Sequence, residues 1–175
     1  MRDPVNTVVL LGTGLIGSGW AARCLAHGLD VVAWDPDPSA EAALVANGDN
    51  AWPILEEVGL QSGADRNRLK FETSLEAALS VADYVQENAP DDELLKIRLI
   101  TQADQHLPPD VVIASSSSGI RPTLLQEKTQ YPQRVMIGHP FNPVYLLPLV
   151  EIVGGQATGE DTLRAGGAFY RSLSM

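Results

Sequence analysis

The sequence has one cysteine, few basic residues and no long apolar run. The single thiol, Cys24, cannot form an internal disulfide, and residues 1–4 do not begin a signal-peptide pattern, so we expect a cytoplasmic protein. Apolar stretches such as residues 8–11 have the length of a strand, far below the roughly 20 residues of a membrane-spanning helix. The sequence therefore predicts no insertion into a membrane.

Positive charge is also scarce, because 12 Lys and Arg residues face 22 Asp and Glu residues and leave a formal net charge of -10. This balance argues against nucleic acid or an anionic membrane as a partner, so any anionic ligand must be held by local groups. Hydrophobic residues make up 45% and charged residues 19% of the chain, which is typical of a globular protein. The 175 residues suffice for one domain, and we expect residues 1–175 to form it.

Short β-branched runs alternate with helical segments along the chain. We expect strands at 5–11, 30–34, 69–73, 82–86, 111–114, 134–138 and 147–153. We expect helices at 15–27, 39–46, 74–80, 91–106, 122–128 and 161–172, with a broken helical segment over 50–68. This alternation predicts an α/β fold with a doubly wound, mostly parallel sheet of the Rossmann type. The last residues carry no capping or turn signal, so we also expect the chain to be part of a longer protein.

A G-x-G-x-x-G motif follows the first predicted strand and opens the first predicted helix. Its residues are Gly12, Thr13, Gly14, Leu15, Ile16 and Gly17. The glycines permit a tight turn, approach of a pyrophosphate and close packing of helix on strand. Asp35 lies about 20 residues beyond Gly14, where a carboxylate binds ribose hydroxyls and favours NAD over NADP. The alternative is an ordinary glycine loop in which Asp35 only starts a turn.

A serine run and a histidine each follow one of the later predicted strands. Parallel strands end at the same edge of a sheet, so we expect Ser118 and His139 to meet there. A histidine accepts a proton near neutral pH, as oxidation of a secondary alcohol requires. Glu151 lies in an apolar run, where a buried carboxylate needs a partner, and His139 is the candidate. His27 and His106 lie far apart in the sequence, and no pair has the spacing of metal ligands, so no metal site is predicted.

Four segments together resemble the 3-hydroxyacyl-CoA dehydrogenase superfamily: the glycine motif, the serines at 115–118, the H-P-F-N-P segment at 139–143 and Glu151. The resemblance implies oxidation of a 3-hydroxyl group with NAD as cofactor. The strings at 17–22, 32–36 and 138–154 are most similar to members that oxidise L-carnitine to 3-dehydrocarnitine. The resemblance also implies a second, helical domain that this chain lacks, and a homodimer of the full-length protein.

The resemblance further implies roles for individual residues. His139 corresponds to the general base and Glu151 to the residue that orients it, with Ser118 near the substrate hydroxyl and the nicotinamide. Asn142 corresponds to a residue beside the histidine. The acidic residue and the lysine near the cofactor correspond to Asp91 and Lys96, although Lys96 by itself is typical of a solvated helix position.

Other interpretations stay open at this point. The substrate could be a 3-hydroxyacyl-CoA or a sugar acid such as L-gulonate, or the chain could be a noncatalytic NAD-binding module. Phe141 and Tyr145 are candidates to hold a quaternary ammonium group, but both are equally consistent with ordinary packing.

Overall fold

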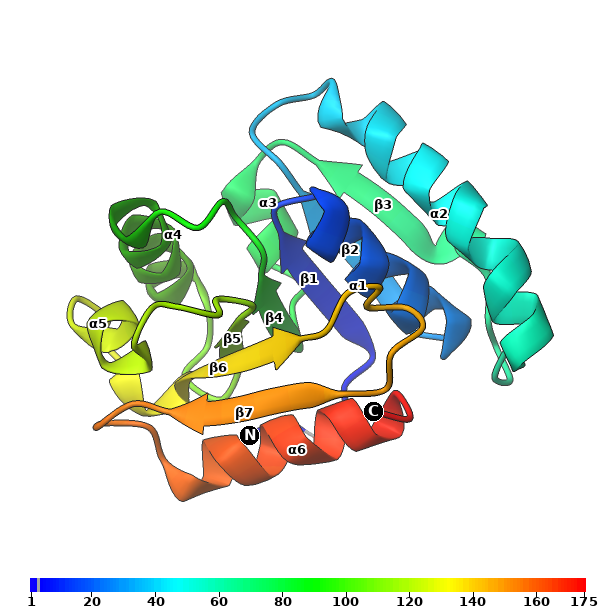
Figure 1. The fold of residues 1–175 in the computed structure, drawn as a ribbon. Coiled ribbons are helices and arrows are strands. Elements are labelled where there is room, and N and C mark those ends of the chain that lie inside the picture. The colour runs from blue at the N-terminus through cyan, green and yellow to red at the C-terminus, as the bar shows by residue number, and fades with distance from the viewer. Residues whose placement is uncertain (3) are drawn as a thin grey trace.

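A seven-stranded sheet forms the centre of the computed structural model, which describes residues 1–2 and 4–175. The strand order is β3-β2-β1-β4-β5-β6-β7, and all neighbouring strands are parallel except β7, which runs antiparallel to β6 (Figure 1). The strands are β1 (Thr7–Leu11), β2 (Asp30–Trp34), β3 (Leu69–Glu72), β4 (Tyr84–Glu87), β5 (Val112–Ser115), β6 (Val135–Pro140) and β7 (Val150–Gly154). This arrangement confirms the predicted Rossmann-type fold.

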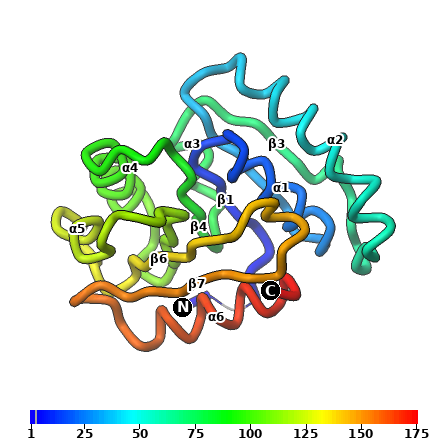
Figure 2. The backbone as a smooth tube through the Cα atoms, viewed as in Figure 1, coloured from blue at the N-terminus to red at the C-terminus, as the bar shows by residue number. Residues whose placement is uncertain are grey.

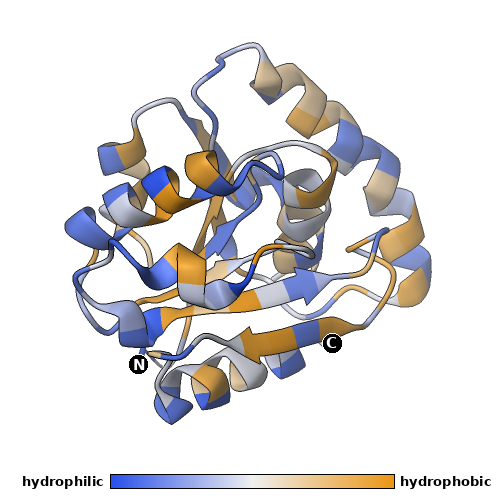
Figure 3. Cartoon of the chain, turned by 60° about the vertical axis from the view of Figure 1, so that its left-hand side comes forward, coloured by the Kyte–Doolittle hydropathy of each residue, from blue (hydrophilic) through white to orange (hydrophobic). Residues whose placement is uncertain are grey.

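Helices cover both faces of the sheet, as the tube in Figure 2 also shows. They are α1 (Leu15–Ala26), α2 (Ala40–Val58), α3 (Leu75–Leu79), α4 (Glu93–His106), α5 (Pro122–Gln126) and α6 (Glu160–Ser172). Successive side chains of a strand point to opposite faces. In β1, Val8 and Leu10 therefore pack with α1 and α6, whereas Val9 and Leu11 pack with α3 and α4. All four residues 8–11 of β1 are buried apolar residues, as expected for a strand that is covered on both faces. In Figure 3, orange apolar residues alternate with blue polar ones along the strands nearest the viewer.

Helix α2 is one continuous helix, whereas the sequence predicted a short helix at 39–46 and a broken helical segment over 50–68. The predicted break at Gly48 is wrong, and Pro53 lies inside the helix on its exposed side. Leu44, Trp52 and Leu55 are buried on the other side, where α2 packs against α1. This apolar stripe stabilises the helix and offsets the intrahelical hydrogen bond that proline removes.

Among the residues that the structure describes, no helix has the length and the apolar character needed to cross a membrane.

Candidate functional site

The glycine motif forms the turn between β1 and α1. Gly12 has a φ of +94°, and a Cβ there would lie 2.9 Å from the backbone of Asn88. A Cβ on Gly17 would lie 2.0 Å from the carbonyl oxygen of Gly12, so the helix could not pack as closely on the strand. A Cβ on Gly14 would meet nothing within 4 Å, which leaves this backbone open to a ligand. The three glycines therefore have the geometry of a pyrophosphate-binding turn.

Asp35 lies directly after β2 and beside this turn. Its Oδ2 accepts hydrogen bonds from the backbone N–H of Thr13 (3.2 Å) and from the Thr13 hydroxyl (3.0 Å). Its Oδ1 accepts from the N–H of Asp37 (3.1 Å). These bonds hold the carboxylate at the edge of the turn, where it stays partly exposed.

A crevice of about 540 Å³ opens at the carboxyl ends of β1, β4, β5 and β6. Ten of the thirteen predicted site residues line it. They are Gly12, Thr13, Gly14, Leu15, Ile16, Asp35, Asp91, Lys96, Ser118 and His139. Gly17 lies behind the turn, and Glu151 and Asn142 lie outside the crevice. One cavity thus contains both the nucleotide-binding turn and the histidine.

His139 and Glu151 face each other in the register of the antiparallel pair β6 and β7. The His139 Nδ1 lies 2.9 Å from the Glu151 Oε2. A carboxylate only accepts hydrogen bonds, so Nδ1–H donates and Nε2 is left as a proton acceptor. The predicted contact is present, but the expected burial of Glu151 is wrong: its side chain is 59% exposed, because β7 is an edge strand.

The serine run contains one hydroxyl without a partner. The hydroxyls of Ser115, Ser116 and Ser117 donate to side chains of β4 and of the loop that follows it. The acceptors are, in that order, Glu87, Asn88 and Asp91. Ser118 is exposed, lines the crevice and makes no side-chain hydrogen bond with the described residues. Of the four serines, Ser118 therefore keeps its full hydrogen-bonding capacity for a ligand.

Lys96 is 2% exposed, so the interpretation as a solvated helix residue is wrong. Its Nζ lies 2.8 Å from the Oε1 of Glu87, which is fully buried, and 2.8 Å from the carbonyl oxygen of Ala89. Glu87 also accepts a hydrogen bond from the N–H of Ala89 (2.6 Å). Sequence reasoning missed Glu87, because the predicted strand ended one residue too early, at Gln86. A carboxylate at the carboxyl end of a strand, in the segment before Pro90, is the signal that could have found it.

Three residues of the loop after β6, Phe141, Asn142 and Tyr145, lie outside the crevice. Asn142 lines a separate hollow of about 160 Å³ together with Tyr145, on the side of α1. The ring of Phe141 lies 5.4 Å from the ring of His139, centroid to centroid. Neither aromatic ring is among the described residues that line the crevice.

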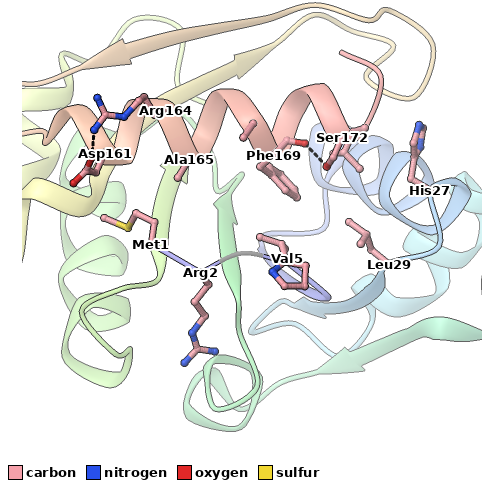
Figure 4. Close-up of a pocket in the computed structure, with 13 residues that line it drawn as sticks. Met1, Arg2, Val5, His27, Leu29, Asp161, Arg164, Ala165, Phe169 and Ser172 are labelled. Atoms are coloured by element: carbon pink, nitrogen blue, oxygen red, sulfur yellow. Dashed lines mark hydrogen bonds and ion pairs between the residues drawn. The ribbon is translucent and has the colours of Figure 1, made fainter.

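A second large hollow lies away from this edge of the sheet. It measures about 550 Å³ and lies between α6, the N-terminal segment and the end of α1 (Figure 4). None of the predicted site residues lines it. No group of three or more His, Cys, Asp or Glu residues that could hold a metal ion occurs in the described part of the chain.

The open parallel sheet, the glycine turn and the carboxylate after β2 define a dinucleotide-binding domain. The chain belongs to the family described as 3-hydroxyacyl-CoA dehydrogenase, NAD binding domain, which matches residues 7–175. NAD is therefore the cofactor of this domain.

Individual relatives in the family have names that specify a substrate. The chain is 52% identical to L-carnitine dehydrogenase of Pseudomonas aeruginosa and 51% identical to that of Burkholderia mallei, over 98% of this chain and 53% of each relative. It spans about half the length of these proteins. Among solved structures, it is similar to (S)-3-hydroxybutyryl-CoA dehydrogenase from Ralstonia eutropha, with a TM-score of 0.89, 32% identity and coverage of 97% of this chain and 61% of that one. The 3-hydroxybutyryl-CoA dehydrogenase of Escherichia coli gives a TM-score of 0.88 at 27% identity, over 97% of this chain and 36% of that one.

Proposed function

We propose that this chain is the NAD-binding and proton-accepting part of an enzyme that oxidises the 3-hydroxyl of L-carnitine to 3-dehydrocarnitine. The observation that carries the proposal is the His139–Glu151 pair, because its histidine opens into the same crevice as the glycine turn. The identity of about half the residues to proteins named L-carnitine dehydrogenase supports the substrate.

The residues of the turn fit NAD. The side of Gly14 where a Cβ would stand is open, and Gly14 caps the N-terminus of α1, whose first N–H groups have no acceptor within the helix and can bind the pyrophosphate. Asp35 accepts hydrogen bonds from ribose hydroxyls and repels a 2'-phosphate. A neighbouring hollow of about 380 Å³, lined by Asp35 and Arg98 among others, offers space for the adenosine half. NAD, when bound, supplies the hydride acceptor.

His139 performs the proton transfer. With Nδ1–H donated to Glu151, the imidazole has one tautomer, and Nε2 takes the proton of the substrate hydroxyl as the alcohol becomes a ketone. Glu151 also stabilises the imidazolium that forms. Ser118 offers its hydroxyl to the substrate oxygen or the nicotinamide. Asn142 lines the separate hollow beside α1, so its proposed role requires that the substrate extend from the crevice into that hollow.

Asp91 and Lys96 act on the cofactor side of the crevice. Lys96 is bound to Glu87 and to the carbonyl of Ala89, so we propose that it holds the loop beside Gly12 in place and does not act as a free cation. Asp91 is fixed by the hydroxyl of Ser117 (3.0 Å) and lines the crevice.

The alternative substrate is a 3-hydroxyacyl-CoA, which the similarity to the two 3-hydroxybutyryl-CoA dehydrogenases favours. The CoA phosphates require positive charge. The chain has a net charge of -10, and Lys96 is the one cation among the described residues that line the crevice. Since Lys96 is already paired, these observations favour the zwitterionic substrate. Phe141 beside His139 is the better-placed ring for its ammonium group.

The organisation of the whole protein is part of the proposal. Residues 1–175 form the NAD-binding domain, and the remaining length of the relatives corresponds to a second, helical domain. We propose a cytoplasmic homodimer, in which the second domain supplies further substrate contacts.

The test is NADH formation by the full-length protein with L-carnitine, D-carnitine, 3-hydroxybutyryl-CoA and L-gulonate in parallel. We expect turnover of L-carnitine alone. His139→Ala should lower kcat by about 100-fold or more with an unchanged Kd for NAD. His106→Ala, at an exposed position on α4, is the matched control. Turnover of the CoA ester alone would replace the substrate, and NAD binding without any turnover would indicate a noncatalytic module.

A further inference from the structure

Gln86 is a buried amide in the central strand β4, with 1% of its surface exposed. A buried amide without partners destabilises a protein by a few kcal/mol, so its contacts are informative. Its Nε2 donates to the carbonyl oxygen of Gly138 (3.0 Å) and to the hydroxyl of Ser116 (2.9 Å). Its Oε1 accepts from the hydroxyl of Tyr170 (2.7 Å). The amide thus connects three segments that meet near the crevice.

These bonds have only one possible direction. The carbonyl of Gly138 can only accept, so the nitrogen of Gln86 faces it and the oxygen faces Tyr170. Tyr170 must then donate to Gln86, and Tyr84 must donate to Tyr170, at 3.1 Å. Burial raises the pKa of Tyr170 above its usual value, so its phenol stays protonated and remains a donor.

Gly138 directly precedes His139 and is packed against Tyr170. A Cβ on Gly138 would lie 1.8 Å from the Tyr170 hydroxyl, so this phenol occupies the place of a side chain. The backbone leading to His139 is therefore held by a hydrogen bond from Gln86 and by direct contact with α6.

Ser116 extends the same network into the crevice, which it lines together with Asn88. Its hydroxyl accepts from the Trp20 Nε1 (3.2 Å) and from Gln86, and donates to the Oδ1 of Asn88 (2.7 Å). The hydrogen-bonding capacity of this hydroxyl is then filled, so Ser116 orients Asn88 and has none left for a substrate.

We propose that Gln86 and Tyr170 are positioning residues that set the place of His139 through the Gly138 backbone and the place of Asn88 through Ser116. The proposal rests on the proposed function of His139 as the general base. Neither residue lines the crevice, so both act through the groups that they hold.

The experiment compares Tyr170→Phe with Tyr84→Phe. Each variant removes one buried phenolic hydroxyl, but only Tyr170→Phe removes the donor to Gln86. The readout in the chain is NMR of carbon-labelled histidine, where three histidines give three signals and His139→Ala assigns one of them. We expect Tyr170→Phe to shift or split the His139 signal and Tyr84→Phe to leave it in place, with exposed His106 unchanged in both.

In the full-length protein, Tyr170→Phe should lower kcat by about 10- to 100-fold, because a small displacement of a reacting group is enough for such a loss. The Kd for NAD should not change. Gln86→Met removes the amide at similar volume and should likewise shift the His139 signal and lower kcat. It replaces Tyr170→Phe in both measurements if that variant does not fold.

A His139 signal and a kcat that stay at their wild-type values in Tyr170→Phe or Gln86→Met would overturn the proposal. Equal effects of Tyr170→Phe and Tyr84→Phe would also overturn it, because general loss of packing would then explain them. If His139→Ala retains turnover, the proposed function fails, whereas the NMR comparison still decides whether this network positions the ring.

Discussion

Replacement of Lys96 by methionine should test whether the buried ion pair holds the cofactor side of the crevice. Methionine keeps most of the volume of the lysine stem, so the change removes a charge and its hydrogen bonds without opening a large cavity. Glu87 would then remain fully buried, with an N–H and a hydroxyl as donors and no cation.

The expected loss follows from this burial. Removal of one partner of a buried ion pair destabilises a protein by about 3–5 kcal/mol, because the other charge stays uncompensated. For a chain of this length each kcal/mol lowers Tm by roughly 2–4 °C, so the expected decrease is on the order of 6–20 °C. Glu87→Gln in the same chain removes the remaining charge and should restore part of this loss.

The assay is urea unfolding with fluorescence detection, together with NAD titration of the folded protein. Lys70→Met, at an exposed position of β3, is the matched control and should change stability by less than about 0.5 kcal/mol. We expect Lys96→Met to weaken NAD binding as well, because Ala89 loses the hydrogen bond from Lys96 beside the glycine turn. A loss below about 1 kcal/mol, typical of a surface pair, would refute the reasoning.

Three further predictions follow from the same contacts. Gly17→Ala should lower stability by about 1–3 kcal/mol because its Cβ would overlap the carbonyl of Gly12, whereas Gly14→Ala should fold normally and lose NAD affinity, as calorimetry can show. Asp35→Ala should lower the preference for NAD over NADP by about 10-fold or more, since hydrogen bonds to a charged group contribute about 1.5–3 kcal/mol; an unchanged ratio would remove this role. Burial lowers the pKa of His27 below 6.5, so its neutral form stabilises the fold above that pH and this contribution is lost as pH falls toward the folded pKa. The difference in unfolding free energy between wild type and His27→Gln should therefore vary with pH below about 6.5 and be constant above it.

Local sequence signals predicted the strands and the glycine turn well. The bounds of β2 match the prediction, because its apolar run ends at an Asp-Pro pair that a buried strand cannot continue. The turn followed from the position of three glycines between strand and helix. The placement of Ser118 and His139 in one crevice followed from topology alone, since both lie near the carboxyl ends of parallel strands.

Contacts between distant segments could not be predicted in this way. Lys96 and Asp104 are charged residues of the amphipathic helix α4, so each is consistent with an exposed position. Each is in fact buried in an ion pair, Asp104 with Arg134, whose side chain also is buried. The exposure of Glu151 depends on β7 being the edge of the sheet, and an apolar run gives no information on which strand lies at the edge.

Strand β4 holds both sides of the crevice in place: the strand that carries His139 and the loop beside the glycine turn. Its residues alternate between the faces of the sheet, so Gln86 points toward α6 and Glu87 toward α4. Gln86 reaches across β5, where its register partner is the small Ala114, and holds the strand that carries His139. Glu87 anchors the loop beside the glycine turn through Lys96. The two networks use different faces of β4 and meet at Asn88, which Gln86 orients through Ser116 and whose backbone lies against Gly12 of the glycine turn.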